Sequence, residues 1–217
     1  MTMDKETVCA RIEAFGIIPA VRTSSAADAR FATEAVSRGG IPIVEITMTV
    51  PGALDVIADL TRNMPDVIVG AGTILDMDMA RRCLDAGASF LTSPGLNLQI
   101  VEFAIKEKTA VLPGALTPTE VIAAWQAGAD FVKVFPCSLV GGDSYIRALK
   151  APLPQVRLVA AGGVNQQTAA QFIVAGASAL GVGGELIPKA ALQQRRPDWI
   201  PELARRFLSI VKEARGR

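Results

Sequence analysis

Eight short runs of apolar and β-branched residues recur at nearly constant intervals along this chain of 217 residues. Their centres lie roughly 20 to 26 residues apart, which is the length of one strand followed by one helix. The eight runs are GIIPAV, IPIVEIT, DVIVGAGT, ASFLTSPG, AVLPGA, DFVKVFP, VRLVAAGG and ALGVGG. Stretches with a helical pattern separate them, so the sequence predicts alternating β and α units with a parallel sheet.

A recurring glycine supports this count. Gly87, Gly128 and Gly176 each end a helical stretch within the tripeptide AGA, and RGG at 38–40 occupies the equivalent place. Glycine is suited to the left-handed position that stops a helix. The marker precedes every second strand. A marker that recurs once in every two strand–helix units predicts an α/β fold, a closed (β/α)₈ barrel of the TIM type. Residues 1–217 are expected to form it as a single domain.

Two further helices are expected outside the eight repeated units. An extra N-terminal helix is predicted at 5–15 and a C-terminal one at 198–214. The alternative fold is an open doubly wound sheet, but such sheets rarely reach eight evenly spaced strands. The GAGT segment also lacks the GxGxxG pattern of dinucleotide-binding folds.

The composition excludes several classes of function. The chain has no histidine, which rules out a Ser-His-Asp triad, a histidine-ligated zinc site and an imidazole acid or base. A net charge of +1 gives no reason to expect nucleic acid as a partner, and no apolar run is long enough for a membrane span. Three cysteines without CxxC spacing indicate reduced thiols in a cytoplasm. One of them, Cys137, is interpreted as a small packing residue, because no neighbouring cation in the sequence would activate it.

A lysine interrupts the otherwise apolar run DFVKVFP. Strand side chains alternate, so Phe131, Lys133 and Phe135 share one face while Val132 and Val134 share the other. The outer face of a barrel packs under helices and must be apolar, which places the valines outside. Lys133 is therefore predicted to point into the barrel.

Other polar residues are predicted to meet this lysine. Alternation puts Glu45 and Thr47 on the inward face of their strand, while Arg22 and Thr73 stand at the C-terminal ends of the first and third strands. Barrel enzymes hold their active sites at that end. A purely structural salt bridge between Lys133 and Glu45 is the alternative, but buried ion pairs often add little net stability.

The chemistry of this set indicates covalent catalysis. Burial of a lysine disfavours its charged form and can lower its pKa by up to about 3–5 units. A neutral amine attacks carbonyl carbon, so Lys133 is predicted to form a Schiff base. In a chain without histidine, Glu45 is the expected proton carrier. Arg22 suits a substrate carboxylate through a bidentate contact, and Thr73 is placed to donate a further hydrogen bond.

Glycine pairs follow the last two strands. They are Gly162–Gly163 and Gly183–Gly184. In barrel folds the loops after these two strands often bind phosphate through backbone amides. Two pairs at these places predict a phosphate-bearing substrate.

Several segments resemble a known family in their order and spacing. The segments VEITMTVPGA, VGAGTIL, SPG, LPGALTPTE, FVKVFP and AGGV resemble those of the bacterial 2-keto-3-deoxy-6-phosphogluconate aldolases, also called 4-hydroxy-2-oxoglutarate aldolases. The resemblance runs from about residue 17 to residue 186. It implies a class I lyase without metal or cofactor, which cleaves a 2-keto-3-deoxy sugar acid phosphate to pyruvate and glyceraldehyde 3-phosphate.

The resemblance also implies roles for individual residues. Lys133 matches the Schiff-base lysine and Glu45 the acid/base. Four further positions match substrate-contacting positions of the family: Arg22 and Thr73 for the pyruvate carboxylate, and Pro94 and Phe135 for the pocket wall. Because relatives are commonly homotrimers, a homotrimer is expected here.

The chain departs from the family pattern at three positions. Many relatives carry arginine at the position of Thr49, so binding of the substrate carboxylate is expected to rest more heavily on Arg22. Ala161 stands where threonine usually precedes the glycine pair, and Gly184 stands where serine often follows the strand-8 glycine. The last two changes remove hydroxyls but keep backbone amides. They bear on the phosphate preference rather than on the aldol chemistry.

Other functions are compatible with parts of this pattern. Within the same chemistry, the substrate could be 4-hydroxy-2-oxoglutarate or the stereoisomer 2-dehydro-3-deoxy-6-phosphogalactonate. A sugar-phosphate isomerase or epimerase would use the lysine as an electrostatic clamp without an imine. A non-catalytic barrel would have no use for an inward Lys–Glu–Arg set. Fold alone does not separate these alternatives.

Overall fold

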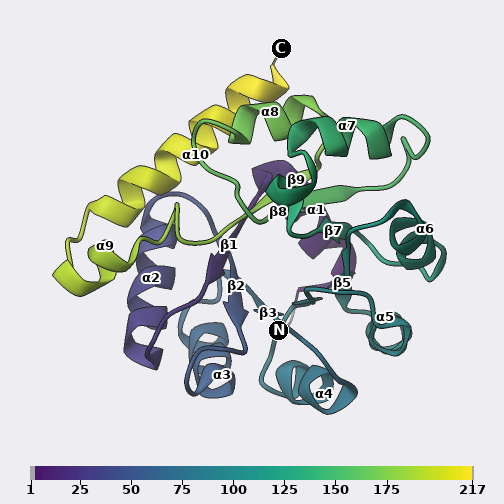
Figure 1. Ribbon diagram of the computed structural model, residues 1–217. Coiled ribbons are helices and arrows are strands. Elements are labelled where there is room, and N and C mark those ends of the chain that lie inside the picture. The colour runs from purple at the N-terminus through teal and green to yellow at the C-terminus, as the bar shows by residue number, and fades with distance from the viewer. Residues whose placement is uncertain (1–2, 217) are drawn as a thin grey trace.

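In the computed structural model, which describes residues 3–216, the strands form a barrel with helices around it (Figure 1). The strands are β1 (Ile17–Val21), β2 (Ile43–Thr47), β3 (Ile68–Gly72), β4 (Phe90–Thr92), β5 (Ala110–Leu112), β6 (Gly114–Ala115), β7 (Val132–Val134), β8 (Leu158–Ala161) and β9 (Ala179–Val182). The helices are α1 (Lys5–Phe15), α2 (Ala26–Arg38), α3 (Ala53–Asn63), α4 (Met77–Asp85), α5 (Leu98–Lys106), α6 (Pro118–Gln126), the short 3₁₀ helix η1 (Cys137–Val140), α7 (Asp143–Lys150), α8 (Ala169–Val174), α9 (Lys189–Gln194) and α10 (Trp199–Arg215). Residues 1, 2 and 217 of the predicted domain lie outside the described residues.

The predicted (β/α)₈ architecture is confirmed. The structure has nine strands rather than eight because the fifth predicted strand is divided into β5 and β6. All neighbours pair in parallel, in the order β5-β4-β3-β2-β1-β9-β8-β7-β6. The strands β5 and β6 are the two halves of one segment on either side of Pro113, which has no amide hydrogen for the ladder. The two ends of the ladder are therefore joined through this segment, and the barrel closes.

The predicted helix stops have the expected backbone geometry. Gly87, Gly128 and Gly176 have φ angles of 98°, 91° and 105°, in the left-handed region that favours glycine. The expected N-terminal helix is α1, which is capped by the Asp4 side chain and followed by Gly16 at its C-cap. The expected C-terminal helix is α10, shifted by one residue from 198–214.

The flanking helices cover two different parts of the barrel. Helix α1 contacts both β5 and β9, which lie three places apart in the closed ladder, so it lies across the amino-terminal end of the barrel. Helix α10 packs along α2 and α8 on the outside (Figure 1). The carboxyl-terminal end stays available for a site. None of the helices in residues 3–216 combines the length and the apolar character needed to cross a membrane.

The three cysteines make stability depend on pH. All are free and buried. Burial raises the pKa of the Cys9 and Cys83 thiols to about 12, from an ordinary 9.0. Burial, helped by the carboxylate of Asp143, raises that of Cys137 to about 11. Between pH 9 and 11 the unfolded chain therefore loses thiol protons that the folded chain keeps.

We predict that the free energy of unfolding falls as the pH rises above 9. The expected slope is about 1.4 kcal/mol per pH unit for each thiol, because the folded state binds more protons there. Urea denaturation at pH 8, 9 and 10 measures it. The Cys83→Ala variant should show a shallower decline than the parent, and an equal decline in both would contradict the assignment.

Candidate active site

Lys133 and Glu45 meet inside the barrel. They come from β7 and β2, which lie four places apart in the closed ladder and so face each other across the interior. The Nζ of Lys133 lies 3.4 Å from Oε2 of Glu45. The side chains are only 13% and 5% exposed. An amine and a carboxylate are thus held within reach of proton transfer, away from bulk water.

Glycines of β3 leave space inside the barrel for the side chains of Glu45 and Phe90. A Cβ atom on Gly72 would lie 2.0 Å from Oε1 of Glu45, and one on Gly70 would lie 2.2 Å from the ring of Phe90. Both glycines therefore face inward, where any side chain would displace a neighbour. Sequence analysis did not assign them a role. The signal was present, since alternation puts two glycines inward beside the strand that carries Glu45.

Two further residues surround the amine of Lys133. Its Nζ donates a hydrogen bond to Oγ1 of Thr92, 3.5 Å away at the end of β4, and lies 5.8 Å from the centre of the Phe135 ring. Phe135 was expected at the pocket wall. Thr92 was missed, although alternation from the inward Phe90 points to it. The amine therefore has one acid, one hydroxyl and one aromatic face around it.

Hydroxyl groups orient the guanidinium of Arg22. It follows β1 and donates to Oγ1 of Thr49 at 3.1 Å and to Oγ1 of Thr73 at 3.3 Å. Thr47 stands behind this contact, with its Oγ1 2.8 Å from that of Thr49 and bonded to the carbonyl of Val21. Thr47 is fully buried, so it acts on Arg22 through Thr49.

Thr73 has an unusual backbone. Its φ of 64° lies in the left-handed region, which β-branched residues rarely enter. Such a conformation costs about 1–3 kcal/mol and persists where the surroundings enforce it, often at functional sites. Here it holds a hydroxyl against Arg22 at the carboxyl end of β3. This strain favours a binding role for Thr73.

A cavity of about 390 Å³ opens above the Lys133–Glu45 pair. Most of the predicted site residues line it: Lys133, Glu45, Arg22, Phe135, Gly162, Gly163, Gly183 and Gly184. Thr73 and Thr47 are not among its lining residues. Thr73 contacts the lining residue Arg22 directly, and Thr47 is linked to Arg22 through Thr49. Pro94 lies instead in a separate hollow formed by the loops after β3 and β4.

The two glycine pairs differ in their geometry. Gly162 and Gly163 have φ angles of 84° and 83°, and a Cβ on Gly163 would lie 2.1 Å from Oγ of Ser138. That loop is therefore tightly packed against the segment after β7. A Cβ on Gly184 would meet nothing within 4 Å, so the space beside it is open. Glu185 also lines the cavity there, and sequence analysis did not single it out.

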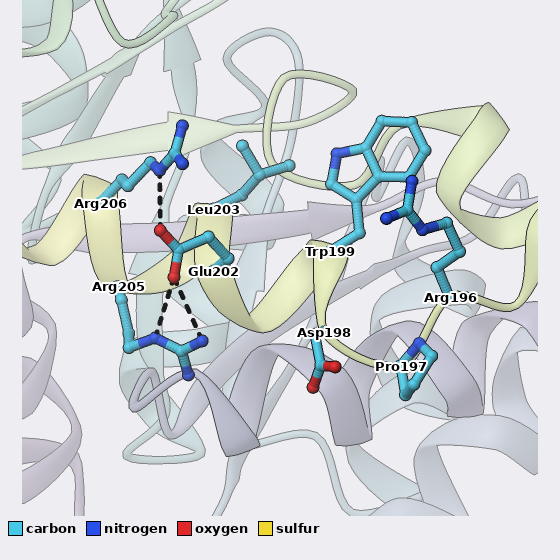
Figure 2. Close-up of a pocket in the computed structure, with 8 residues that line it drawn as sticks. All are labelled: Arg196, Pro197, Asp198, Trp199, Glu202, Leu203, Arg205 and Arg206. Carbon is cyan, nitrogen blue, oxygen red and sulfur yellow. Dashed lines mark hydrogen bonds and ion pairs between the residues drawn. The ribbon is translucent and has the colours of Figure 1, made fainter.

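A second hollow, of about 420 Å³, lies on the outside of the barrel at the start of α10 (Figure 2). Figure 2 shows Glu202 between Arg205 and Arg206, and it forms ion pairs with both. Arg196 stacks 5.4 Å from the centre of the Trp199 ring. These charges are largely neutralised or stacked among themselves. The hollow lacks the reactive set found inside the barrel.

Comparison with known proteins identifies the family. The family model described as KDPG and KHG aldolase matches residues 8–203. The chain belongs to this family. As a member, the chain is an aldolase, a carbon–carbon lyase.

Individual relatives agree with this assignment. The aldolase is 32% identical to the 2-dehydro-3-deoxy-phosphogluconate aldolase of Treponema pallidum (strain Nichols), over 94% of this chain and 98% of that protein. A KDPG aldolase from Legionella pneumophila, solved with pyruvate captured as a covalent carbinolamine, is 27% identical, with a TM-score of 0.85 over 91% of this chain and 96% of that one. A cage designed by fusing symmetric oligomeric domains contains a chain that is 28% identical, with a TM-score of 0.84 over 93% of this chain and 74% of that one.

We predict that Gly72→Ala slows this aldolase without unfolding it. The added methyl group would occupy the place of the Glu45 carboxylate. A displacement near 1 Å at a reacting group costs about 10² in rate. Steady-state kinetics measures the loss, and circular dichroism checks the fold.

Gly95→Ala is the matched control, because a Cβ at that position meets nothing within 4 Å. It should keep full turnover. Equal turnover in the two variants would contradict the role given to Gly72.

Proposed function

We propose that this aldolase cleaves 2-dehydro-3-deoxy-6-phosphogluconate to pyruvate and D-glyceraldehyde 3-phosphate through a Schiff base on Lys133. The contact of 3.4 Å between Lys133 and Glu45 inside a cavity carries this proposal. The name of the Treponema relative supports the substrate. The carbinolamine captured in the Legionella relative supports the covalent route.

The first half of the reaction builds an electron sink. The neutral amine of Lys133 attacks the C2 keto carbon of the substrate, and loss of water from the carbinolamine leaves a protonated imine. Arg22 binds the C1 carboxylate through its guanidinium, with Thr73 as a further donor. Glu45 accepts a proton from the amine as it adds to the carbonyl, and gives a proton to the hydroxyl that leaves as water.

The second half breaks the carbon–carbon bond. Glu45 takes the proton of the C4 hydroxyl, the C3–C4 bond breaks, and its electron pair moves towards the imine nitrogen. This gives an enamine and the free aldehyde. Glu45 then returns the proton to C3, and water hydrolyses the resulting imine to pyruvate and the free amine. One carboxylate serves both proton transfers, which suits a chain that has no histidine.

A second substrate with the same reacting end is 4-hydroxy-2-oxoglutarate. The family description, which names both KDPG and KHG aldolases, supports it. Its C1 to C4 portion would occupy the same contacts. Only the group beyond C4 would differ.

We also propose that the aldolase works as a homotrimer in the cytoplasm. The similar chain in a cage built from symmetric oligomeric domains supports self-association. The three free cysteines suit a reducing compartment.

Borohydride reduction in the presence of pyruvate tests the Schiff base. We predict one pyruvate-derived adduct per chain by intact mass, located on Lys133 by peptide mapping. Lys133→Ala should abolish it, because no other amine among residues 3–216 lines the cavity. An adduct on a different lysine, or none in the parent, would overturn the proposal.

The variant Glu45→Gln separates proton transfer from imine formation. We predict that the pyruvate adduct still forms on Lys133, while turnover falls by about 10²–10⁴ because the proton carrier is lost. Trapping yield and steady-state kinetics on the same preparation measure the two effects. Unchanged turnover would remove Glu45 from its role.

A further inference from the structure

Glu185 places a negative charge in the lining of the cavity, at the loop after β9. It belongs to the turn after β9, is exposed, and lines the cavity beside Gly183 and Gly184. Within residues 3–216 its carboxylate forms no ion pair. The charge is therefore available to whatever part of a substrate reaches this loop.

The cations of the cavity lie elsewhere. Of the described residues that line it, only Arg22 and Lys133 are basic, and Lys133 is paired with Glu45. The guanidinium of Arg22 bonds to threonines that follow β2 and β3, whereas Glu185 follows β9, on the other side of β1. Lys189 lines an adjoining hollow rather than this cavity. Within the described part of the chain, the end beside Glu185 thus has no lining cation of its own.

The remaining groups at this end are uncharged. Ala161 presents only a methyl group, and the glycine pairs present backbone. The hydroxyl of Ser138 packs against Gly163, and the Ser138 side chain is exposed. Amides and a hydroxyl donate hydrogen bonds, and a carboxylate accepts them. This combination suits alcohol groups, whereas a phosphate dianion would meet repulsion from Glu185.

We propose that Glu185 is a selectivity residue and gives this aldolase a second activity, the cleavage of unphosphorylated 2-keto-3-deoxy sugar acids. Its carboxylate accepts hydrogen bonds from the hydroxyls at the far end of such a substrate. The inference rests on the proposed Schiff-base function, because the same C3–C4 bond breaks. The products are pyruvate and an unphosphorylated hydroxyaldehyde, and the proton of the C4 hydroxyl passes through Glu45 to C3 as before.

The test compares kcat/KM of this protein for 2-keto-3-deoxygluconate and for its 6-phosphate. In the parent, the two values should lie within about 100-fold of each other. Glu185→Gln removes the charge but keeps hydrogen-bonding capacity. It should raise kcat/KM for the phosphate by about tenfold, since a dianion no longer faces a carboxylate, and change that for the alcohol less than threefold. Glu185→Ala should raise the phosphate value similarly and lower the alcohol value.

Glu102→Gln is the matched control, because this exposed glutamate on α5 is remote from the cavity lining and its loss changes the net charge equally. It should leave both values unchanged. A parent preference for the phosphate above 100-fold, or a Glu185→Gln variant with the parent's ratio, would overturn the inference. Pyruvate trapping on Lys133 reports the Schiff base separately, so a failed selectivity test with intact trapping leaves the proposed function standing.

Discussion

The contact between Lys133 and Glu45 requires the barrel to close. Their strands, β7 and β2, share no edge and lie on opposite sides of the ladder. In an open sheet the same two side chains would stand several strands apart, at a spacing near 4.8 Å per strand. Closure depends on the continuous segment that contributes both β5 and β6, with Pro113 between them. The reacting pair is therefore a product of topology as much as of two inward side chains.

A buried ion pair is a poor stabiliser, and its surroundings explain why this one persists. Desolvation of two charges often exceeds their mutual attraction. Here the amine donates a hydrogen bond to Thr92, the face of Phe135 lies near it, and Gly72 leaves room for the carboxylate. The pair also borders a cavity rather than solid core. A scaffold has no need of that arrangement, whereas a reaction that exchanges protons between an amine and a substrate does.

Arg22 illustrates how the site keeps a charge available. Arginines on the surface pair with carboxylates, such as Arg30 with Asp59. Within residues 3–216, Arg22 forms no such ion pair and is held by the hydroxyls of Thr49 and Thr73. Neutral acceptors fix the direction of a guanidinium without cancelling its charge. A substrate carboxylate would then find the charge unneutralised.

Strand periodicity and glycine placement made much of the fold predictable. The eight runs and the stops at Gly87, Gly128 and Gly176 follow from local rules that act within a few residues. Alternation also pointed Lys133 and Glu45 inward. It did not separate β5 from β6, because one proline divides an otherwise apolar run. Pro94 came from resemblance alone, and the structure puts it in a neighbouring hollow, since the course of a loop does not follow strand periodicity.

Strands and loops also have different roles at the site: strands carry the reacting groups, and a loop carries the residue proposed to select the substrate. Lys133 and Glu45 project from paired strands, whose positions many hydrogen bonds and buried neighbours fix. Glu185 stands on a turn, where exposed side chains can change without repacking the core. Barrel enzymes vary their substrates through such loops while the strands keep the reacting groups. A change of charge at position 185 can therefore alter which substrates are accepted, according to the group at the end remote from the carboxylate, while the C3–C4 bond that breaks stays the same.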